Sequence, residues 1–245
     1  MIPLLLAATL LIPDTGRVWR AGFSYGFEDF TGARDTWHAA TVHVGRRFAR
    51  GTVIGEFVYA RRFHQDRGGL AIDAYHDLWR RAYGNVRVQR VPGGGVVPKT
   101  DVAGEAFQGL PGGWEISGGY RRMAFDSNAS DIWSAGVARY AGDWYLRARA
   151  LLIPRPGTTG AVLVSVRRYL ATPEEYLDVL VGIGSEVIVA DSDLGVGDVR
   201  ATRSAALTWR RSLTPGLGIQ VGAAWNDTEG LPVRRGLAFG VTHRW

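Results

Sequence analysis

Apolar and polar positions alternate with a period of two residues along most of the chain. In the segment GLGIQVGAAWND, one set of alternate positions is apolar and the other is small or polar. The apolar set is Leu217, Ile219, Val221, Ala223 and Trp225. Successive side chains of a strand point to opposite faces, so this spacing predicts a strand with one apolar face. No sustained helical spacing occurs after residue 15.

The alternating segments recur between breaks of Gly, Pro, Asp and Asn, and they predict about fourteen strands, within limits of about twelve to sixteen. The expected strands cover residues 17–28, 35–48, 52–63, 69–79, 82–91, 99–109, 113–124, 131–141, 143–153, 159–169, 175–186, 199–211, 216–226 and 236–245. The fold class is therefore all-β.

The connections between these strands alternate in length. Short connections such as ARG, PGG, AGD and LTPG follow even-numbered strands, whereas longer ones such as TGARD, HQDRGG and VPGGGVVPKT follow odd-numbered strands. This asymmetry is typical of an antiparallel, up-and-down transmembrane β-barrel with periplasmic turns and extracellular loops. An even number of strands places both termini in the periplasm. A soluble β-sandwich alternates equally well but does not explain the asymmetry.

Aromatic residues near the short connections predict an interfacial girdle: Phe48, Trp114, Tyr140, Trp144 and Trp209. The last segment, GLAFGVTHRW, predicts a strand that pairs with the first and closes the barrel. Its lipid-facing positions are Leu237, Phe239, Val241 and Trp245.

The chain has 245 residues, no cysteine and a formal net charge of +6. Its arginines are scattered at strand spacing rather than clustered, which argues against nucleic-acid binding. No apolar run reaches the roughly 20 residues of a spanning helix. The start, MIPLLLAATLLIP, predicts a signal-peptide-like segment at 1–15 before a barrel domain at 16–245, although it lacks a basic beginning. A buried first strand is the alternative.

The polar face of the strands carries charges of both signs, with arginine in excess. A one-residue slip of 143–153 would turn Arg147 and Arg149 into lipid at about 2–4 kcal/mol each, so we expect both to face the lumen. An arginine-rich lumen favours anionic solutes, but the same charges would also close it by pairing with Glu56, Glu115 and Asp178. The predicted lumen-lining and solute-binding residues are Arg20, Glu56, Arg62, Glu115, Arg121, Arg147, Arg149, Arg167, Asp178 and Arg210.

No catalytic, metal or cofactor site is predicted. The segment GFSYG matches G-x-S-x-G, but Ser24 lies within an alternating strand instead of at a strand-to-helix turn. His38 and His43 have an odd separation, which puts them on opposite strand faces. The segment PGGGVVP has no strand-to-helix setting, so it reads as a loop and not as a phosphate cradle.

Several stretches resemble the YaiO family of outer-membrane β-barrel proteins: YARRF (59–63), GWEISGGYRRMAF (113–125), VARYAGDWYLRARALLIP (137–154) and RRYLATPEEYLDVLVGIGS (167–185). The resemblance implies a Gram-negative outer-membrane location, insertion by the barrel-assembly machinery, and a role alongside exopolysaccharide export. Many family members carry a tetratricopeptide region before the barrel, and we do not expect one within these 245 residues. The resemblance also implies that the outward residues of the last strand, Leu237, Phe239, Val241 and Trp245, serve as the assembly signal, in which His243 stands where an apolar or aromatic residue is more usual.

Together these features predict a non-enzymatic outer-membrane pore or export-associated component, with anionic saccharides or exopolysaccharide as its solutes. Its expected partners are outer-membrane lipid, the assembly machinery and polysaccharide-export components. One alternative is a structural or partner-binding barrel whose lumen is closed by salt bridges. Another is a barrel lipid hydrolase.

Overall fold

The computed structural model describes residues 18–32, 35–95, 97–154, 158–188 and 198–245. Within these ranges the chain forms fourteen strands and one 3-10 turn, η1 (Pro111–Gly113). The strands are β1 (Trp19–Phe30), β2 (Trp37–Phe48), β3 (Gly51–Arg62), β4 (Gln65–Trp79), β5 (Ala82–Arg90), β6 (Thr100–Gly109), β7 (Trp114–Ala124), β8 (Ala129–Ala141), β9 (Trp144–Ile153), β10 (Thr159–Tyr169), β11 (Tyr176–Ile188), β12 (Asp198–Ser212), β13 (Leu217–Thr228) and β14 (Arg234–Arg244).

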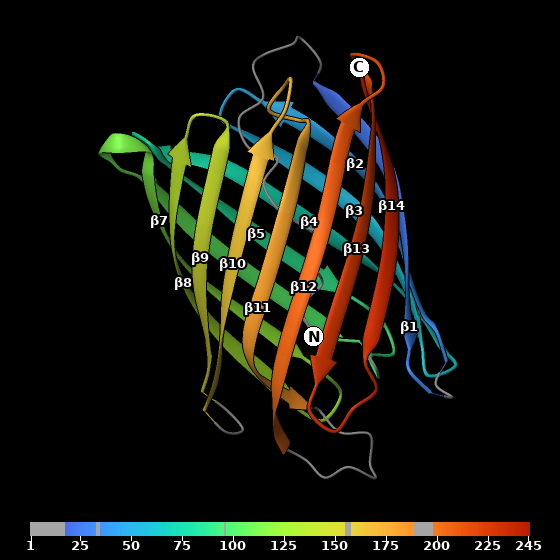
Figure 1. The fold of residues 1–245 in the computed structure, drawn as a ribbon. Helices are drawn as coiled ribbons and strands as arrows, with labels where there is room; N and C mark the ends of the chain where they lie inside the picture. The colour runs from blue at the N-terminus through green and yellow to red at the C-terminus, as the bar shows by residue number, and fades with distance from the viewer. Residues whose placement is uncertain (1–17, 33–34, 96, 155–157, 189–197) are drawn as a thin grey trace.

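The strands form one closed antiparallel barrel in which each strand pairs with its sequence neighbours (Figure 1). β1 and β14 close it, with Arg20 opposite Arg244 and Phe30 opposite Arg234. The backbones of Trp19 and Trp245 exchange two hydrogen bonds of 3.0 and 3.1 Å. Closure leaves no strand edge with unpaired backbone groups, which is the condition for strands in lipid. The predicted barrel and its closing pair are confirmed.

The two ends of the barrel differ. The end that holds Trp19 and Trp245, here called the turn end, has connections of two residues at 49–50, 80–81 and 142–143. It lies at the top of Figure 1. The opposite end, called the loop end, has longer connections such as 91–99 between β5 and β6. Across the described residues, no helix is long and apolar enough to cross a membrane.

One loop-end connection is shorter than the sequence predicts. Residues 64–68 were expected in a loop, but β3 and β4 are joined by Phe63 and His64 alone. Both have positive φ angles, 49° and 60°, as the two central residues of a type I′ hairpin turn require. The strand pairing resumes at once, with Arg62 opposite Gln65. The polar residues after His64 therefore belong to β4.

The outer face of the barrel is apolar. Large side chains on alternate strand positions are half exposed or more, among them Phe57, Leu70, Ile72 and Ile183 at 51%, 66%, 58% and 65%. A patch this extensive on a soluble monomer would be an aggregation site, whereas on a closed barrel it is the surface that lipid covers.

Aromatic side chains surround the turn end, as the sequence predicts, with one exception. Phe48, Trp114 and Trp144 point outward and are 50%, 43% and 44% exposed. Tyr140 instead points inward, because it is the register partner of the buried Tyr145. Its ring centroid lies 4.6 Å from that of Tyr145. Tyr140 therefore belongs to the lumen and not to the girdle.

Arginines of neighbouring strands lie over this girdle. Arg139 is the register partner of Trp114 and Arg168 that of Trp144. Their guanidinium carbons lie 5.1 and 5.5 Å from the ring centroids. A cation over an aromatic face is stabilised by the ring quadrupole, and both charges sit where the strands leave the apolar surface.

Candidate functional site in the barrel lumen

Contacts between non-adjacent strands identify the inner face. Arg147 on β9 forms an ion pair with Glu105 on β6, across the two intervening strands β7 and β8. Side chains converge in this way on the concave side of a closed sheet. Side chains alternate between the two faces along each strand, and directly paired residues of neighbouring strands share a face. The Arg147–Glu105 contact therefore fixes which face of every strand lines the lumen.

All ten residues named from the sequence as lumen-lining occupy this inner face. They are Arg20, Glu56, Arg62, Glu115, Arg121, Arg147, Arg149, Arg167, Asp178 and Arg210. Whether any of them binds a solute stays a prediction. The structure also shows which of these side chains form ion pairs or hydrogen bonds, and with which partners.

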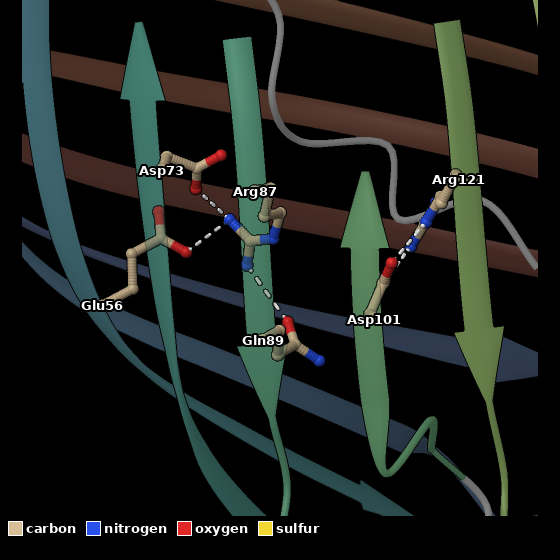
Figure 2. Close-up of polar contacts among 6 residues, drawn as sticks. All are labelled: Glu56, Asp73, Arg87, Gln89, Asp101 and Arg121. Carbon is tan, nitrogen blue, oxygen red and sulfur yellow. Dashed lines mark hydrogen bonds and ion pairs between the residues drawn. The ribbon is translucent and has the colours of Figure 1, made fainter. Parts of the chain in front are cut away.

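The first cluster lies on β3, β4 and β5 (Figure 2). Arg87 Nη1 lies 2.8 Å from Glu56 Oε2 and also forms an ion pair with Asp73. Arg87 Nη2 donates a hydrogen bond of 3.1 Å to Gln89 Oε1. Asp73 is 1% exposed and Glu56 is 8% exposed. One guanidinium thus neutralises two buried carboxylates. Burying a carboxylate costs free energy, and the charge-assisted hydrogen bonds of this network offset that cost.

The neighbouring pair joins β6 and β7. Arg121 Nε donates a 2.8 Å hydrogen bond to Asp101 Oδ1, and its Nη2 donates a second to Oδ2 (Figure 2). This is the bidentate arrangement that a planar guanidinium forms with a carboxylate. Asp101 is 3% exposed, so both of its oxygens depend on Arg121.

A third cluster centres on Glu105. Besides its ion pair with Arg147, its second oxygen lies 3.7 Å from Arg149 Nη1. Arg147 Nη2 also donates a 3.2 Å hydrogen bond to Ser117 Oγ, and its guanidinium lies 5.3 Å from the ring centroid of Phe107. Two inward arginines therefore share one carboxylate.

Towards the turn end the lumen becomes aromatic. Arg167 Nε lies 2.7 Å from Asp178 Oδ2, and its guanidinium lies 4.1 Å from the ring centroid of Tyr176. Glu115 is not paired with an arginine, contrary to the expectation from sequence. It accepts hydrogen bonds from Tyr83 and Tyr145, at 3.1 and 3.3 Å.

Four charged residues of these clusters are not among the ten named from the sequence: Asp73, Arg87, Asp101 and Glu105. The last two lie in the segment 99–109, whose apolar residues alternate poorly. The usable signal is the spacing of the acidic residues, because Asp101 and Glu105 are four positions apart and share a face with Phe107.

Between the charged residues near their ends, among them Arg20 and Glu28 on β1, Arg234 and Arg244 on β14 and Arg210 on β12, the remaining strands line the lumen with small, uncharged side chains. On β12, β13, β14 and β1 the inward positions include Ser204, Ala206, Thr208, Gly222, Ala224, Gly236, Ala238, Gly240, Thr242, Gly22, Ser24 and Gly26. The lumen consequently has a charged wall on β3–β11 and a small-residue wall along the middle of β12, β13, β14 and β1. Ser24 is part of the latter and lies in an unbroken strand, not at a nucleophile elbow.

The predicted assembly-signal residues lie on the outer face. Leu237, Phe239, Val241 and Trp245 are 48%, 48%, 46% and 52% exposed. The ring of His243, on the same face, stacks on Trp245 with a centroid distance of 5.5 Å. Recognition of this strand by an assembly machinery stays a prediction.

Metal ligands do not cluster in the part of the barrel that the structure describes. Among the residues that the structure describes, no group of three or more His, Cys, Asp or Glu side chains is arranged to hold an ion. The clusters described above are built mainly from arginine, carboxylate and tyrosine side chains.

Comparison with known proteins identifies the family. The YaiO membrane beta barrel domain matches residues 19–187, more than half of the chain. The chain belongs to the YaiO family. No curated protein sequence matches it.

Solved structures share the fold of this YaiO-family barrel. Outer membrane protein Omp33 of Acinetobacter baumannii is 11% identical, with 94% of this chain and 98% of that one covered and a TM-score of 0.56. A monoaromatic hydrocarbon channel, CymD, is 7% identical over 93% and 88%, with a TM-score of 0.64. A bacterial polysaccharide outer membrane secretin is 11% identical over 95% and 100%, with a TM-score of 0.62. The protein is an outer-membrane β-barrel.

Proposed function

We propose that this barrel is an outer-membrane pore for anionic solutes, with acidic saccharides as the solute class. The observation that carries the proposal is the division of the lumen into a charged wall and a small-residue wall. With a strand spacing of about 4.8 Å and a tilt of about 40°, fourteen strands give a backbone radius of about 14 Å. Glycine, alanine and serine fill little of that radius, so the small-residue wall leaves room beside the charged one.

The sign of the solute follows from the inward arginines. They outnumber the inward carboxylates in the Glu105 cluster, where Arg147 and Arg149 share one acid. Guanidinium groups bind carboxylates with two parallel hydrogen bonds and raise the local concentration of anions. The polysaccharide secretin shares this fold, which is compatible with a saccharide as solute.

The proposal includes an orientation and partners. The turn end, with Trp19 and Trp245, would face the periplasm, as in barrels with short periplasmic turns. The outward residues of β14 would be read by the barrel-assembly machinery, and export components would meet the periplasmic mouth. The segment expected to be signal-like, 1–15, lies outside the described residues.

Planar-bilayer recording of the purified protein tests the pore. Under a potassium chloride gradient we expect stepwise conductance and a reversal potential of the sign that anion preference gives. Absence of conductance at every voltage would refute the pore, and a cation-selective reversal potential would refute the solute class.

A closed structural barrel is the second proposal, and the shared carboxylate of Glu105 favours it. Glu105 on β6 forms ion pairs with both Arg147 and Arg149 on β9, so two long side chains are held in place across the lumen wall from β6 to β9. If the ion pairs close the lumen, Glu105→Gln should produce conductance that the unaltered protein lacks. If the protein already conducts, this role is excluded.

A hydrolytic role has no support in the site geometry. Ser24 faces Thr41 and Gly240 in the pairing register, and neither residue is a general base. We expect no turnover of a chromogenic ester by purified protein; turnover that Ser24→Ala abolishes would contradict the proposal.

A further inference from the structure

Two inward arginines at the turn end, Arg20 and Arg210, differ from most inward arginines in lacking an acidic partner among the described residues. Arg87, Arg121, Arg147, Arg167 and Arg244 each have a carboxylate within ion-pair distance. In the described part of the chain, Arg20 and Arg210 have none. The Nε of Arg20 is moreover buried without a hydrogen-bond partner. A buried guanidinium nitrogen left in this state costs free energy unless a ligand satisfies it.

The backbone around Arg20 is shaped to hold that side chain. Its register partner on β2 is Gly45, and a Cβ at Gly45 would lie 2.9 Å from Arg20 Nε. Two positions along, His43 lies over Gly22, where a Cβ would lie 2.5 Å from the imidazole Cε1. Two glycines thus leave space for two cationic or polar side chains to lie along the wall.

The surroundings of Arg20 concentrate positive charge. On β14 its direct register partner is Arg244, and like charges in directly opposite positions destabilise a sheet. Arg244 is compensated by Glu174, which enters from the β10–β11 connection. Arg210 is a further electrostatic neighbour of both Arg20 and His43. Glu175, the other acid of that connection, accepts a hydrogen bond of 3.4 Å from the Ser212 amide.

The carboxylate that faces this group is already engaged. Glu56 is an electrostatic neighbour of Arg20 and His43, but its Oε2 lies 2.8 Å from Arg87. Tyr75 is the other neighbour of Arg20. A negative group with two oxygens would supply what the local side chains do not.

We propose that Arg20 and Arg210, with His43 beside them, form an anion-binding site at the turn end of the lumen, and that its ligand is the carboxylate of a uronic-acid unit in a saccharide chain. The inference deepens the proposed function and rests on it for the saccharide. Guanidinium binds a carboxylate through two parallel donors. Tyrosine faces suit sugar rings, and Tyr75 is the tyrosine neighbour of Arg20.

Calorimetric titration of the detergent-solubilised full chain tests the site. The probes are trigalacturonate, neutral maltotriose and inorganic phosphate. We expect binding of trigalacturonate that weakens with salt, no binding of maltotriose, and binding of phosphate at least tenfold weaker. The double variant Arg20→Gln with Arg210→Gln should bind trigalacturonate at least tenfold more weakly, while Arg20→Lys should lose less. Gly45→Ala should weaken binding severalfold, because the new methyl displaces Arg20.

The matched control neutralises an ion pair on the outer face, Asp131→Asn with Arg122→Gln, and should bind within twofold of the unaltered protein. Heat-modifiable migration on a gel establishes that each variant is folded. Equal loss in this control, or unchanged affinity in the Arg20 and Arg210 variant, would overturn the site. Phosphate bound as tightly as trigalacturonate would overturn the uronic-acid assignment.

Conductance separates this inference from the proposed function. If the protein binds trigalacturonate but never conducts, the proposed pore is refuted and the proposed binding site is supported. If the Arg20 and Arg210 variant conducts with unchanged anion preference and binds trigalacturonate with unchanged affinity, the proposed site is refuted and the proposed pore is supported.

Discussion

Replacing Arg87 by glutamine should be among the most damaging single substitutions in this barrel. Arg87 is the cation shared by Asp73, 1% exposed, and Glu56, 8% exposed. Without it, two carboxylates would face each other in a site with little access to water. Removing one partner of a buried ion pair costs about 3–5 kcal/mol, so we expect Arg87→Gln to lose at least that much of the unfolding free energy.

The measurement is urea-induced unfolding of the protein from lipid vesicles, followed by tryptophan fluorescence. A triple variant, Glu56→Gln, Asp73→Asn and Arg87→Met, removes all three charges together and should stay within about 1–2 kcal/mol of the unaltered protein, because buried ion networks replaced by neutral side chains are often close to neutral in stability.

An exposed arginine supplies the second control. Arg139 stacks on Trp114 at the turn end, and Arg139→Gln should cost no more than about 1 kcal/mol. A loss below about 1 kcal/mol for Arg87→Gln, or a triple variant as unstable as the single one, would refute the view that Arg87 compensates two buried acids.

Three further substitutions test the assignment of faces. Phe23→Arg should lower stability by about 2–4 kcal/mol in urea unfolding, because the 48% exposed side chain faces lipid, whereas Ser24→Arg on the lumen side should cost clearly less; equal losses would contradict the register. Gly184→Ala should cost about 1–3 kcal/mol, since its Cβ would lie 2.4 Å from that of Ala161, while Gly118→Ala meets nothing within 4 Å and serves as the control. His243→Leu should leave outer-membrane insertion intact or improve it, measured by the folded fraction in outer-membrane extracts; a marked loss of insertion would count against a lipid-facing β14.

Strand positions and faces were predictable from the sequence because the period of two is a local property. The expected strand at 159–169 matches β10 at both ends, and those at 143–153 and 113–124 each differ from β9 and β7 by one residue. The closing pair followed as well, since a barrel in lipid has no other partner for its last strand. The turn at Phe63 and His64 could not be predicted from local sequence. Both residues adopt positive φ angles because the pairing of β3 with β4 requires a two-residue turn there.

Side-chain partners could not be predicted in the same way. Glu115 was expected to meet an arginine and instead meets Tyr83 and Tyr145, two strands away on either side. Tyr140 was assigned to the girdle because it lies near a short turn, but the register with Tyr145 turns it inward.

The sequence by itself determined that this is a closed β-barrel with an apolar outside and an arginine-rich inside, because alternation encodes a face for every residue of a strand. Only the tertiary structure decided which inward charges are neutralised and which are not. Arg121 finds Asp101 and Arg147 finds Glu105, whereas Arg20 lies against Gly45 and opposite Arg244. The physical reason is that the pairing of charges depends on distances across strands that lie 20 to over 200 residues apart in the chain, and the register of the whole closed sheet sets those distances.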